Sequence, residues 1–493
     1  MRIAVIDGGI EPVLCPNLLS EFDLYVQEDG RVIKRTESER ILTDHGTVSA
    51  RIICLYAPKA ELCSLKVFDR EKLQVSVSRL LAALAWCYQQ KIPLIHMSLG
   101  STLWMDYAPI RRIAARLVQN GQILVAAHSN NSIYTMPACF MGVLGVVTDK
   151  TYQKNEYHIV EAGWRQVQIQ ASSRHILVTE DGQPFETQVS NSYAAPVVTA
   201  KVHEILSDPE MDGKPVSAVY QKLAGQESNL FRMRPDFIED AVLFHGKREG
   251  LWPELCFFSI TERVDDPDSL VVAIDRNPYM PVVSIPSGSR ETDGRVFRIC
   301  QERCRLGFLY AGKAPVEFVN RDLLFWDEGQ YCETFRHVGH KMEGVFPEDT
   351  ARLLVEGEGC FSLQAAVKIQ QEFQEHGYPC VIVSDYPYAY LYDMEYLPDD
   401  AETERFAMDM AALRQASVMI YCLKNKVRNK EPKYDLKVSV EKRVEMETAG
   451  AQIYLPEMQT HGEIKRVYQY VLSYEEKDYS NDEGLTQSFQ SNP

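Results

Sequence analysis

The sequence predicts an α/β protein whose N-terminal part, residues 1–207, folds around a doubly wound parallel sheet. Short apolar runs alternate there with amphipathic segments, as strands alternate with helices in such folds. Polar residues follow directly after several of these runs, and the carboxyl ends of parallel strands open into a common ligand crevice. A second alternation, between residues 352 and 423, predicts a βαβαβ unit further along the chain.

The first domain contains several short apolar runs bounded by polar or turn residues. We expect strands at Arg2–Ile6, Glu61–Val67, Pro93–Met97, Gln122–Ala127 and Val143–Val147. Apolar residues at helical spacing predict helices at His45–Leu55, Val75–Gln89, Ile110–Val118 and Ser192–Leu206. Asn120 and Gly121 supply a stop signal after the third helix. Pro196 is compatible with the fourth helix, because first-turn amides have no intrahelical partner.

The chain has 493 residues, which is too long for a single core, so we expect several domains. The expected parts are the doubly wound domain at 1–207, a linker with a supporting helix at 208–250, a strand-rich α/β segment at 251–347, a βαβαβ domain at 348–474 and a disordered acidic tail at 475–493. Within the strand-rich segment we expect strands at Leu255–Ile260, Leu270–Ile274 and Arg295–Cys300.

Charge and hydropathy restrict the classes of partner. A formal net charge of -17 argues against nucleic acid and anionic membranes, which are bound through concentrated lysine and arginine. We expect no membrane span, because no stretch approaches the roughly 18 apolar residues that one requires. The first apolar run is interrupted by Asp7, so we expect no signal peptide and no long propeptide, and hence a cytoplasmic protein. Nothing in the sequence indicates which oligomeric state the protein adopts.

The 12 cysteines are scattered along the chain without the dense spacing of a disulfide scaffold, which is typical of a reducing compartment. Cys300 and Cys304, with Cys332 downstream, could be offered as zinc ligands, but no matching second pair and no histidine cluster accompanies them. We interpret them as buried small apolar residues. No acidic loop of the calcium-binding type is recognisable, so we expect no cofactor and no obligatory metal.

Four segments carry the residue types of nucleophilic catalysis. IAVIDGGI, DHGTVSA, ILVAAHSNN and SNSYAAP supply Asp7, His45, Asn130 and Ser192 in that order. A serine hydroxyl is a poor nucleophile until an imidazole takes its proton, and a buried carboxylate must hold that imidazole in the right tautomer. An amide donor such as Asn130 then stabilises the developing oxyanion. Asn131 is an alternative for this last role.

These segments resemble the motifs of the subtilisin-like serine peptidases over Met1–Leu206, and PKAELCSLKVFD, ALAW and IPLIHMSLGS between them resemble the same family. The order Asp, His, Ser differs from that of chymotrypsin-like and α/β-hydrolase enzymes. The resemblance implies a doubly wound sandwich with Asp7, His45 and Ser192 as the triad and Asn130 in the oxyanion hole. It also implies a substrate pocket with two walls, formed by Ser98, Leu99 and Gly100 and by Ala127, His128 and Ser129.

The chain departs from the family pattern at several positions. Asp7-Gly8-Gly9 lacks the hydroxyl that usually follows the aspartate, and Ser190-Asn191 stand where the family has glycine and threonine. His128 and Ser129 replace small residues, which predicts a narrower or more polar specificity pocket.

The resemblance implies a serine endopeptidase, similar to cytoplasmic members of the family that mature ribosomally made peptides by removing a leader. Its partner would be a precursor peptide. A cytoplasmic protease must be selective or restrained, and the C-terminal half is the place we expect this control. Two alternatives stay open: an inactive peptide-binding module, and a peptide ligase or macrocyclase that passes the acyl group to an amine.

The βαβαβ unit resembles a P-loop fold with a degenerate loop at residues 357–362. The GK[ST] element is missing, and the carboxylates of Glu356 and Glu358 flank the loop and should repel anions. We therefore favour a structural or peptide-binding role over a nucleotide-driven regulator.

Overall fold

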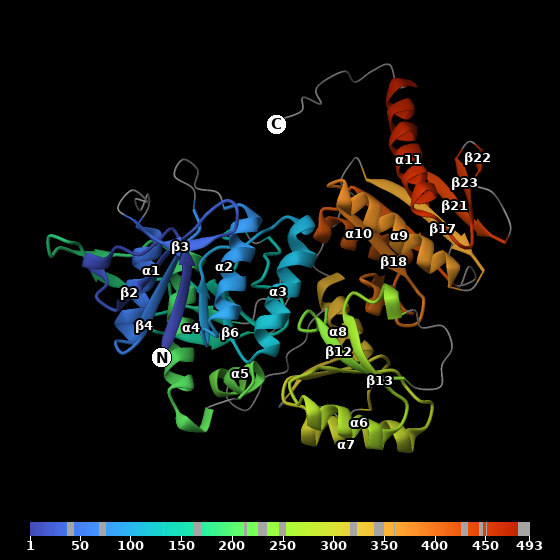
Figure 1. Ribbon diagram of the computed structural model, residues 1–493. Coiled ribbons are helices and arrows are strands. Elements are labelled where there is room, and N and C mark those ends of the chain that lie inside the picture. The colour runs from blue at the N-terminus through green and yellow to red at the C-terminus, as the bar shows by residue number, and fades with distance from the viewer. Residues whose placement is uncertain are drawn as a thin grey trace. The chain divides into compact units, whose positions relative to one another are not determined.

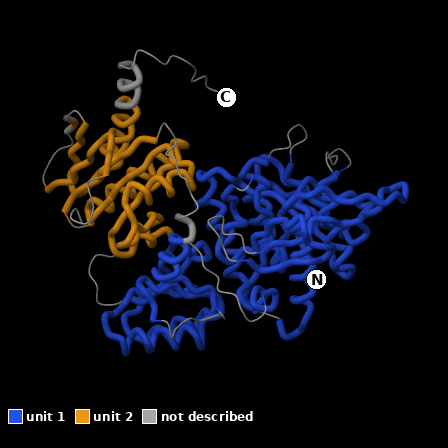
Figure 2. The backbone as a smooth tube through the Cα atoms, turned by 180° about the vertical axis from the view of Figure 1, so that it is seen from behind, with its two compact units in different colours: residues 1–251, 258–341 blue, residues 252–257, 342–493 orange. Residues whose placement is uncertain are grey.

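The computed structural model describes residues 1–36, 44–68, 75–131, 133–160, 169–211, 214–224, 234–245, 253–315, 323–339, 350–358, 360–424, 432–442, 447–449 and 451–481. The chain divides into two compact units, which Figure 2 distinguishes by colour. Unit 1 comprises residues 1–251 and 258–341, and unit 2 comprises residues 252–257 and 342–493. Each unit is described by itself.

A nine-stranded sheet forms the first part of unit 1. In order across the sheet its strands are β3 (Val32–Lys34), β2 (Leu18–Val26), β4 (Glu61–Lys66), β1 (Arg2–Asp7), β5 (Leu94–Met97), β6 (Ile123–Ala127), β7 (Val143–Thr148), β9 (Ile169–Ala171) and β8 (Tyr157–Ile159). Neighbours pair in parallel except at the two edges, where β2–β3 and β8–β9 are antiparallel. The predicted α/β class is confirmed, and the sheet is mixed at its edges instead of parallel throughout.

Four helices flank this sheet: α1 (His45–Tyr56), α2 (Val77–Gln89), α3 (Tyr107–Gln119) and α4 (Asn191–Leu206). After β1 the chain forms β2 and β3, and it then runs through α1 to β4, through α2 to β5 and through α3 to β6. Helix α4 packs against α1 and so shares its face. Figure 1 shows α2 and α3 side by side.

The strands and helices expected in residues 1–207 are confirmed to within a few residues of their ends. The sequence analysis did not include the antiparallel hairpin of β10 (Ile176–Val178) and β11 (Pro184–Glu186), which precedes α4. Helix α5 (Val216–Ala224) follows α4. Short 3-10 turns occur at Pro12–Leu14, Trp104–Asp106, Pro209–Met211, Pro253–Leu255 and Ala389–Tyr392.

A second, five-stranded parallel sheet completes unit 1. Its order is β13 (Ser259–Val264), β12 (Asp240–Phe244), β14 (Val282–Ser284), β15 (Gly307–Tyr310) and β16 (Leu324–Asp327). The helices of this layer are α6 (Pro267–Arg276), α7 (Arg290–Arg303) and α8 (Glu328–Gly339). The apolar faces of α6 and α7 pack with the strands into one core that includes Phe244, Phe297 and Phe308.

Two of the strands predicted in this region are wrong. Leu270–Ile274 lies in α6 and Arg295–Cys300 lies in α7. Short apolar runs do not distinguish a strand from a buried helix by period alone. The decisive signals were the caps: the Asp266 carboxylate accepts from the amides of two residues at the start of α6, and Ser289 caps α7 in the same way.

Unit 2 contains a seven-stranded sheet of order β19 (Glu395–Tyr396), β18 (Cys380–Ser384), β20 (Val418–Cys422), β17 (Ala351–Gly357), β21 (Leu436–Glu441), β23 (Gln452–Pro456) and β22 (Glu447–Ala449). The predicted βαβαβ unit is confirmed as β17, α9 (Phe361–Glu375), β18, α10 (Thr403–Arg414) and β20. Helix α11 (His461–Asn481) continues past residue 475, where the sequence predicts a disordered tail. The rest of that tail, 482–493, lies outside the described residues.

Candidate active site

The predicted catalytic residues lie where the central strands of the nine-stranded sheet have their carboxyl ends, which we call the carboxyl edge of the sheet. Asp7 ends β1, Ser98 follows β5, and Asn130 comes three residues after β6. These strands are neighbours and run in parallel, so their carboxyl ends meet. Helices α1 and α4 both begin near this edge, with His45 and Ser192 in their first turns.

Asp7 and His45 form a direct pair. The Nδ1 atom of His45 lies 2.9 Å from Oδ1 and 3.0 Å from Oδ2 of Asp7, whose exposed fraction is 1%. The amide of Gly8 donates to Oδ1 at 2.6 Å, so a backbone donor holds the carboxylate where the family pattern has a hydroxyl. Gly46 permits this approach: a Cβ there would lie 2.4 Å from the Gly9 carbonyl oxygen.

The carboxylate sets the proton affinity of the imidazole. Burial disfavours the charged ring, but the hydrogen bond and the negative charge of Asp7 outweigh burial and raise the pKa of His45 above its usual 6.5. With Nδ1 facing the carboxylate, Nε2 is the nitrogen left for proton transfer. The pair therefore has the properties of a general base held in one tautomer.

The hydroxyl of Ser192 is turned toward β5 in this structure. Its Oγ donates to the Ser98 carbonyl oxygen at 3.2 Å, and the Ser98 hydroxyl donates back to the Ser192 carbonyl oxygen at 3.2 Å. Ser192 and His45, both within the described part of the chain, form no hydrogen bond with each other. The ring of His45 lies 5.4 Å, centroid to centroid, from that of Tyr193. Catalytic hydrogen bonds often form only in the substrate complex, and a rotation of the Ser192 side chain changes its partner.

A buried histidine behind the serine anchors α4 to the sheet. The two ring nitrogens of His96 lie 2.8 Å from the Ser98 and Thr199 hydroxyls. Burial lowers the pKa of His96 to about 4, so the ring is neutral at physiological pH. This network links β5 to the first turns of α4 without introducing a charge.

A second histidine, His175, joins the ends of α1 and α4. Its Nδ1 lies 2.9 Å from the Tyr56 hydroxyl at the end of α1, and its Nε2 lies 3.0 Å from the Tyr193 carbonyl oxygen. Burial lowers the pKa of His175 despite these bonds. The sequence analysis missed this positioning role, because a histidine outside the motifs gives no signal of what it contacts.

Asn130 contacts the loop that leads into the serine. Its Oδ1 accepts from the Asn191 amide at 2.9 Å, and its Nδ2 donates to the Ser190 hydroxyl at 3.3 Å. For the alternative residue, Asn131, the recorded bond is from its backbone amide to the Ser129 hydroxyl. The structure therefore places the Asn130 amide beside the serine loop.

Asn191 fixes the same loop from the other side. Its Nδ2 donates to the carbonyl oxygens of His128 and Ser129, both at 3.0 Å, and its Oδ1 accepts from the Thr148 amide at 2.8 Å. The sequence analysis treated this residue only as a departure from the family pattern. Its position directly before Ser192 was the available signal that it orients the serine.

The residues predicted to line the substrate pocket lie on two neighbouring segments. Ser98, Leu99 and Gly100 follow β5, while His128 and Ser129 follow Ala127 at the end of β6. A Cβ on Gly100 would lie 2.5 Å from the Met136 carbonyl oxygen, so this segment needs glycine to pack there. The buried ring of His128 lies against Gly145 of β7. Their role in substrate binding stays a prediction.

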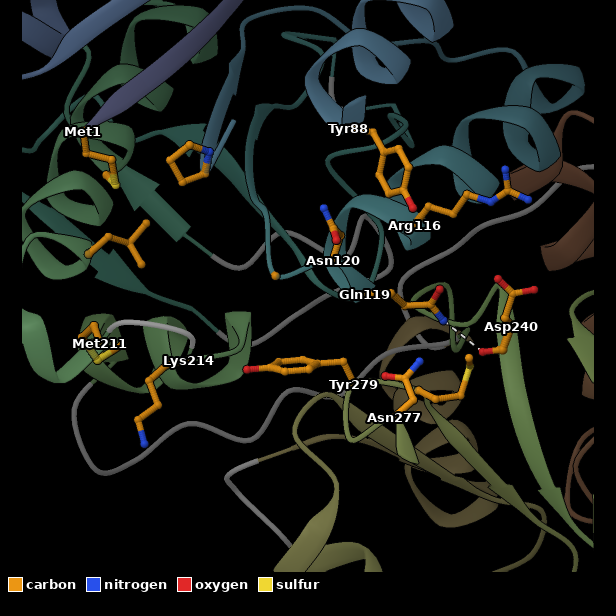
Figure 3. Close-up of a pocket in the computed structure, with 14 residues that line it drawn as sticks. Met1, Tyr88, Arg116, Gln119, Asn120, Met211, Lys214, Asp240, Asn277 and Tyr279 are labelled. Carbon is orange, nitrogen blue, oxygen red and sulfur yellow. Dashed lines mark hydrogen bonds between the residues drawn. The ribbon is translucent and has the colours of Figure 1, made fainter. Parts of the chain in front are cut away.

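Figure 3 shows a cavity of about 790 Å³ elsewhere in unit 1. Its lining includes Met1, Tyr88 and Asn120, which precede strands β1, β5 and β6. The amino ends of these strands lie at the opposite edge of the sheet from Asp7 and Asn130. This cavity contains none of the predicted catalytic residues.

Side chains in and beside the loop at residues 357–362, which we compared with a phosphate-binding loop, contact other side chains of the protein. The Glu356 carboxylate pairs with Lys437 at 2.7 Å and Glu358 with Lys442 at 3.2 Å. The Ser362 hydroxyl lies 2.8 Å from that of Tyr386, and a Cβ on Gly357 would lie 2.9 Å from Val440 Cβ. This glycine therefore serves the packing of β17 on β21. Gly359 lies outside the described residues.

Cys300 and Cys304, which we interpret as buried small apolar residues and not as zinc ligands, are buried in the core of the second sheet. Among the described residues, no group of three or more potential metal ligands comes together. Within the same part of the chain, no helix is long and apolar enough to cross a membrane.

No protein-family profile and no curated protein sequence matches the chain. Its structure matches a lanthipeptide protease with 15% identity and a TM-score of 0.36 over 46% of this chain and 81% of that one. The epidermin leader peptide processing serine protease EpiP of Staphylococcus aureus matches with 16% identity and a TM-score of 0.36 over 46% of this chain and 71% of that one. The nisin leader peptidase NisP of Lactococcus lactis matches with 15% identity and a TM-score of 0.35 over 45% of this chain and 81% of that one.

The solved structures similar to this chain thus include three proteases, each aligned over just under half of this chain's length. At these identities and TM-scores, the chemistry has to be argued from the side chains of this chain.

Proposed function

We propose that the N-terminal domain is a serine endopeptidase that uses Asp7, His45 and Ser192. The observation that carries this proposal is the buried carboxylate of Asp7 at 2.9 Å from His45 Nδ1, at the sheet edge where α4 presents Ser192. A paired, buried carboxylate leaves His45 Nε2 basic and aimed in one tautomer. The chemistry requires only that the Ser192 hydroxyl turn from Ser98 toward this nitrogen.

In the proposed reaction, Ser192 Oγ forms a bond to the substrate carbonyl carbon while its proton passes to His45 Nε2. The carbonyl oxygen becomes an oxyanion, which accepts hydrogen bonds from Asn130 Nδ2 and the Ser192 amide. The C–N bond then breaks, and Nε2 returns the proton to the leaving amine. Water attacks the acyl ester through the same proton route and restores Ser192.

The proposed substrate is a ribosomally made precursor peptide from which a leader is removed. The solved structures that match include proteases named for leader peptide processing, which supports this class of substrate. A net charge of -17 supports a peptide substrate over nucleic acid or an anionic membrane. We assign recognition of the substrate, or shielding of the cleft, to the C-terminal half.

We further propose a cytoplasmic location and no obligatory metal. The 12 cysteines are scattered along the chain without the dense spacing of a disulfide scaffold, which supports a reducing compartment. The thermal unfolding midpoint should stay the same in excess EDTA, and a marked fall would show a structural ion. Cell fractionation tests the location.

Digestion of a peptide library by the purified chain, with mass spectrometry of the products, tests the proposed function. Cut bonds are expected with the native protein and absent with Ser192→Ala and His45→Ala, while Ser192→Ala keeps the native unfolding midpoint and His45→Ala remains folded. A broad preference for large apolar residues would contradict the narrower or more polar pocket. Products that are lighter by one water than the expected hydrolysis products would identify a ligase. Binding of peptides without any products would identify a peptide-binding module.

A further inference from the structure

Two hydrogen-bond donors of the proposed oxyanion site already share an acceptor within the protein. The Nδ2 atom of Asn130 and the amide of Ser192 each donate to the Ser190 hydroxyl oxygen, both at 3.3 Å. These are the same two N–H groups that the substrate oxyanion needs. The Ser190 oxygen therefore lies within hydrogen-bonding distance of both donors. The oxygen of a bound substrate carbonyl would have to occupy a similar position.

The local structure explains why the hydroxyl lies there. Ser190 caps the N-terminus of α4 with an extended backbone (φ -155, ψ 143), and a serine at this position accepts from the amide two residues on. The Asn130 amide is held by its second bond, in which Oδ1 accepts from the Asn191 amide at 2.9 Å. The Asn130 side-chain amide and the Ser192 backbone amide are thus fixed in position. The Ser190 side chain, which lies between them, is the part that can rotate.

We propose that the Ser190 hydroxyl competes with the substrate for the oxyanion donors. It occupies them in the resting site and rotates about its Cα–Cβ bond when a substrate carbonyl enters. This inference rests on the proposed function and deepens it, because it identifies the residue that restrains the site. No covalent step is added, since each donor exchanges one oxygen acceptor for another.

Such a competitor lowers the basal reactivity of the site. Displacing the hydroxyl costs the same free energy for every substrate, so it lowers every rate by the same factor. A peptide with many contacts outside the scissile bond can offset this cost, whereas a short peptide with few contacts is left with a very low rate. The restraint therefore limits stray cleavage without changing the relative preference among substrates.

The rate of phosphonylation by a small alkyl phosphonofluoridate tests this without knowledge of the natural substrate. In that reaction Ser192 Oγ bonds to phosphorus, fluoride leaves, the serine proton passes to His45, and the phosphoryl oxygen takes the oxyanion position. Ser190→Gly should raise the second-order rate constant by about 3- to 30-fold, because one or two weak hydrogen bonds no longer have to be exchanged. Intact-protein mass spectrometry measures the rate.

Ser289→Gly is the matched control. Ser289 caps α7 and accepts from the Thr292 amide at 3.3 Å, so this change removes an equivalent cap away from the site. It should leave the rate unchanged. Ser190→Ala provides a second variant that also lacks the hydroxyl but keeps the Cβ atom, so it controls for the extra backbone freedom of glycine, and it should also react faster than the native protein.

A Ser190→Gly rate equal to or below the native rate would overturn the inference, as would an equal gain in Ser289→Gly. The gain should also shrink in an Asn130→Ala background, where one of the two contacts is already missing. A gain of the same size there would show that the hydroxyl acts elsewhere. If neither the native protein nor the variants react, the proposed function itself is wrong. If the native protein reacts at Ser192 but Ser190→Gly gains nothing, the function stands and only the competition is refuted.

Discussion

At the scale of single residues, the proposed chemistry depends on the pair formed by Asp7 and His45. Burial of the ring works against protonation, while the carboxylate of Asp7 works for it and prevails. Because a general base must be neutral, activity should fall as the pH drops below the raised pKa of His45. The protonated ring also stabilises the folded state, an effect fully present below pH 6.5 and lost as the pH rises through the raised pKa.

Replacing Asp7 by Asn tests this balance. Burial then outweighs the remaining, weaker attraction of Asp44, so the pKa of His45 should fall below 6.5, and the reaction rate should fall by about 10⁴-fold. An NMR titration of the His45 ring protons measures the pKa. Asp44→Asn is the control, because the exposed Asp44 contributes less to the shift and should lower the pKa by a smaller amount. An unchanged pKa in Asp7→Asn would mean that the carboxylate is not the cause.

Asn130→Ala removes one of the two proposed oxyanion donors. We expect the rate of peptide cleavage to fall by about 10² to 10³ with little change in substrate binding. Asn131→Ala, one residue further along, should change the rate little, because its recorded bond comes from the backbone amide. Steady-state kinetics on a peptide found in the library digest compares the two variants. The reverse order of effects would move the role to Asn131.

For single residues, the sequence indicates which residue types lie in the motifs, but it does not indicate which side chains contact each other. Asp7, His45, Asn130 and Ser192 lie in motifs whose order and composition predict their roles. Ser190 and His175 act through partners that folding brings to them, such as Asn130 and Tyr56. Such partners, 60 and 119 residues away, leave no local pattern to read.

At the scale of elements, the N-terminus of α4 is the part that positions the serine. Asn191 ties it to the ends of β6 and β7 through three hydrogen bonds, and its side chain is buried with an exposed fraction of 6%. Buried polar groups that lose such partners are costly. The loop conformation should therefore depend on this one amide.

Asn191→Ala should lower the free energy of unfolding by about 2 to 4 kcal/mol and slow phosphonylation of Ser192 at least tenfold. Asn17→Ala is the matched control: its Nδ2 also donates to two carbonyl oxygens, those of Pro58 and Ala60, away from the serine loop. It should reduce stability without slowing the reaction. Urea unfolding and the labelling rate provide the two measurements. An equal loss of rate in both variants would show that Asn191 has no special part in placing the serine.

The elements themselves were predictable where the pattern was long and capped. The segments around β1, α1, α3 and β6 have clear periods and end signals, and the structure has them where expected. The runs at residues 270–274 and 295–300 are too short for the period to decide. There the caps, Asp266 and Ser289, were the better evidence for helices.

At the scale of the whole molecule, the two sheets of unit 1 are joined by buried polar contacts from α3. Arg111 donates to the Ile238 carbonyl oxygen and pairs with Glu239 at 3.0 Å, and the Tyr107 hydroxyl donates to Asp236. Arg111 has an exposed fraction of 3%. A sequence cannot reveal this junction, because neither side carries a motif and the partners are more than 100 residues apart.

Arg111→Met should destabilise unit 1 by about 3 kcal/mol, because it leaves the buried Glu239 carboxylate without its nearest cation. Arg116 lies on the same helix and approaches the same carboxylate at 3.5 Å, but its side chain is 53% exposed. Arg116→Met should therefore cost less than about 1 kcal/mol. Thermal unfolding of both variants gives the comparison, and equal losses would show that the buried pair is not what joins the sheets.

The central claim is that Asp7 and His45 activate the hydroxyl of Ser192. Peptide mapping by mass spectrometry after reaction with a phosphonofluoridate tests it most directly. The account predicts one label, on Ser192, that forms at least about a thousand times more slowly in His45→Ala. A label on another residue, or an equally fast reaction without the imidazole, would contradict it.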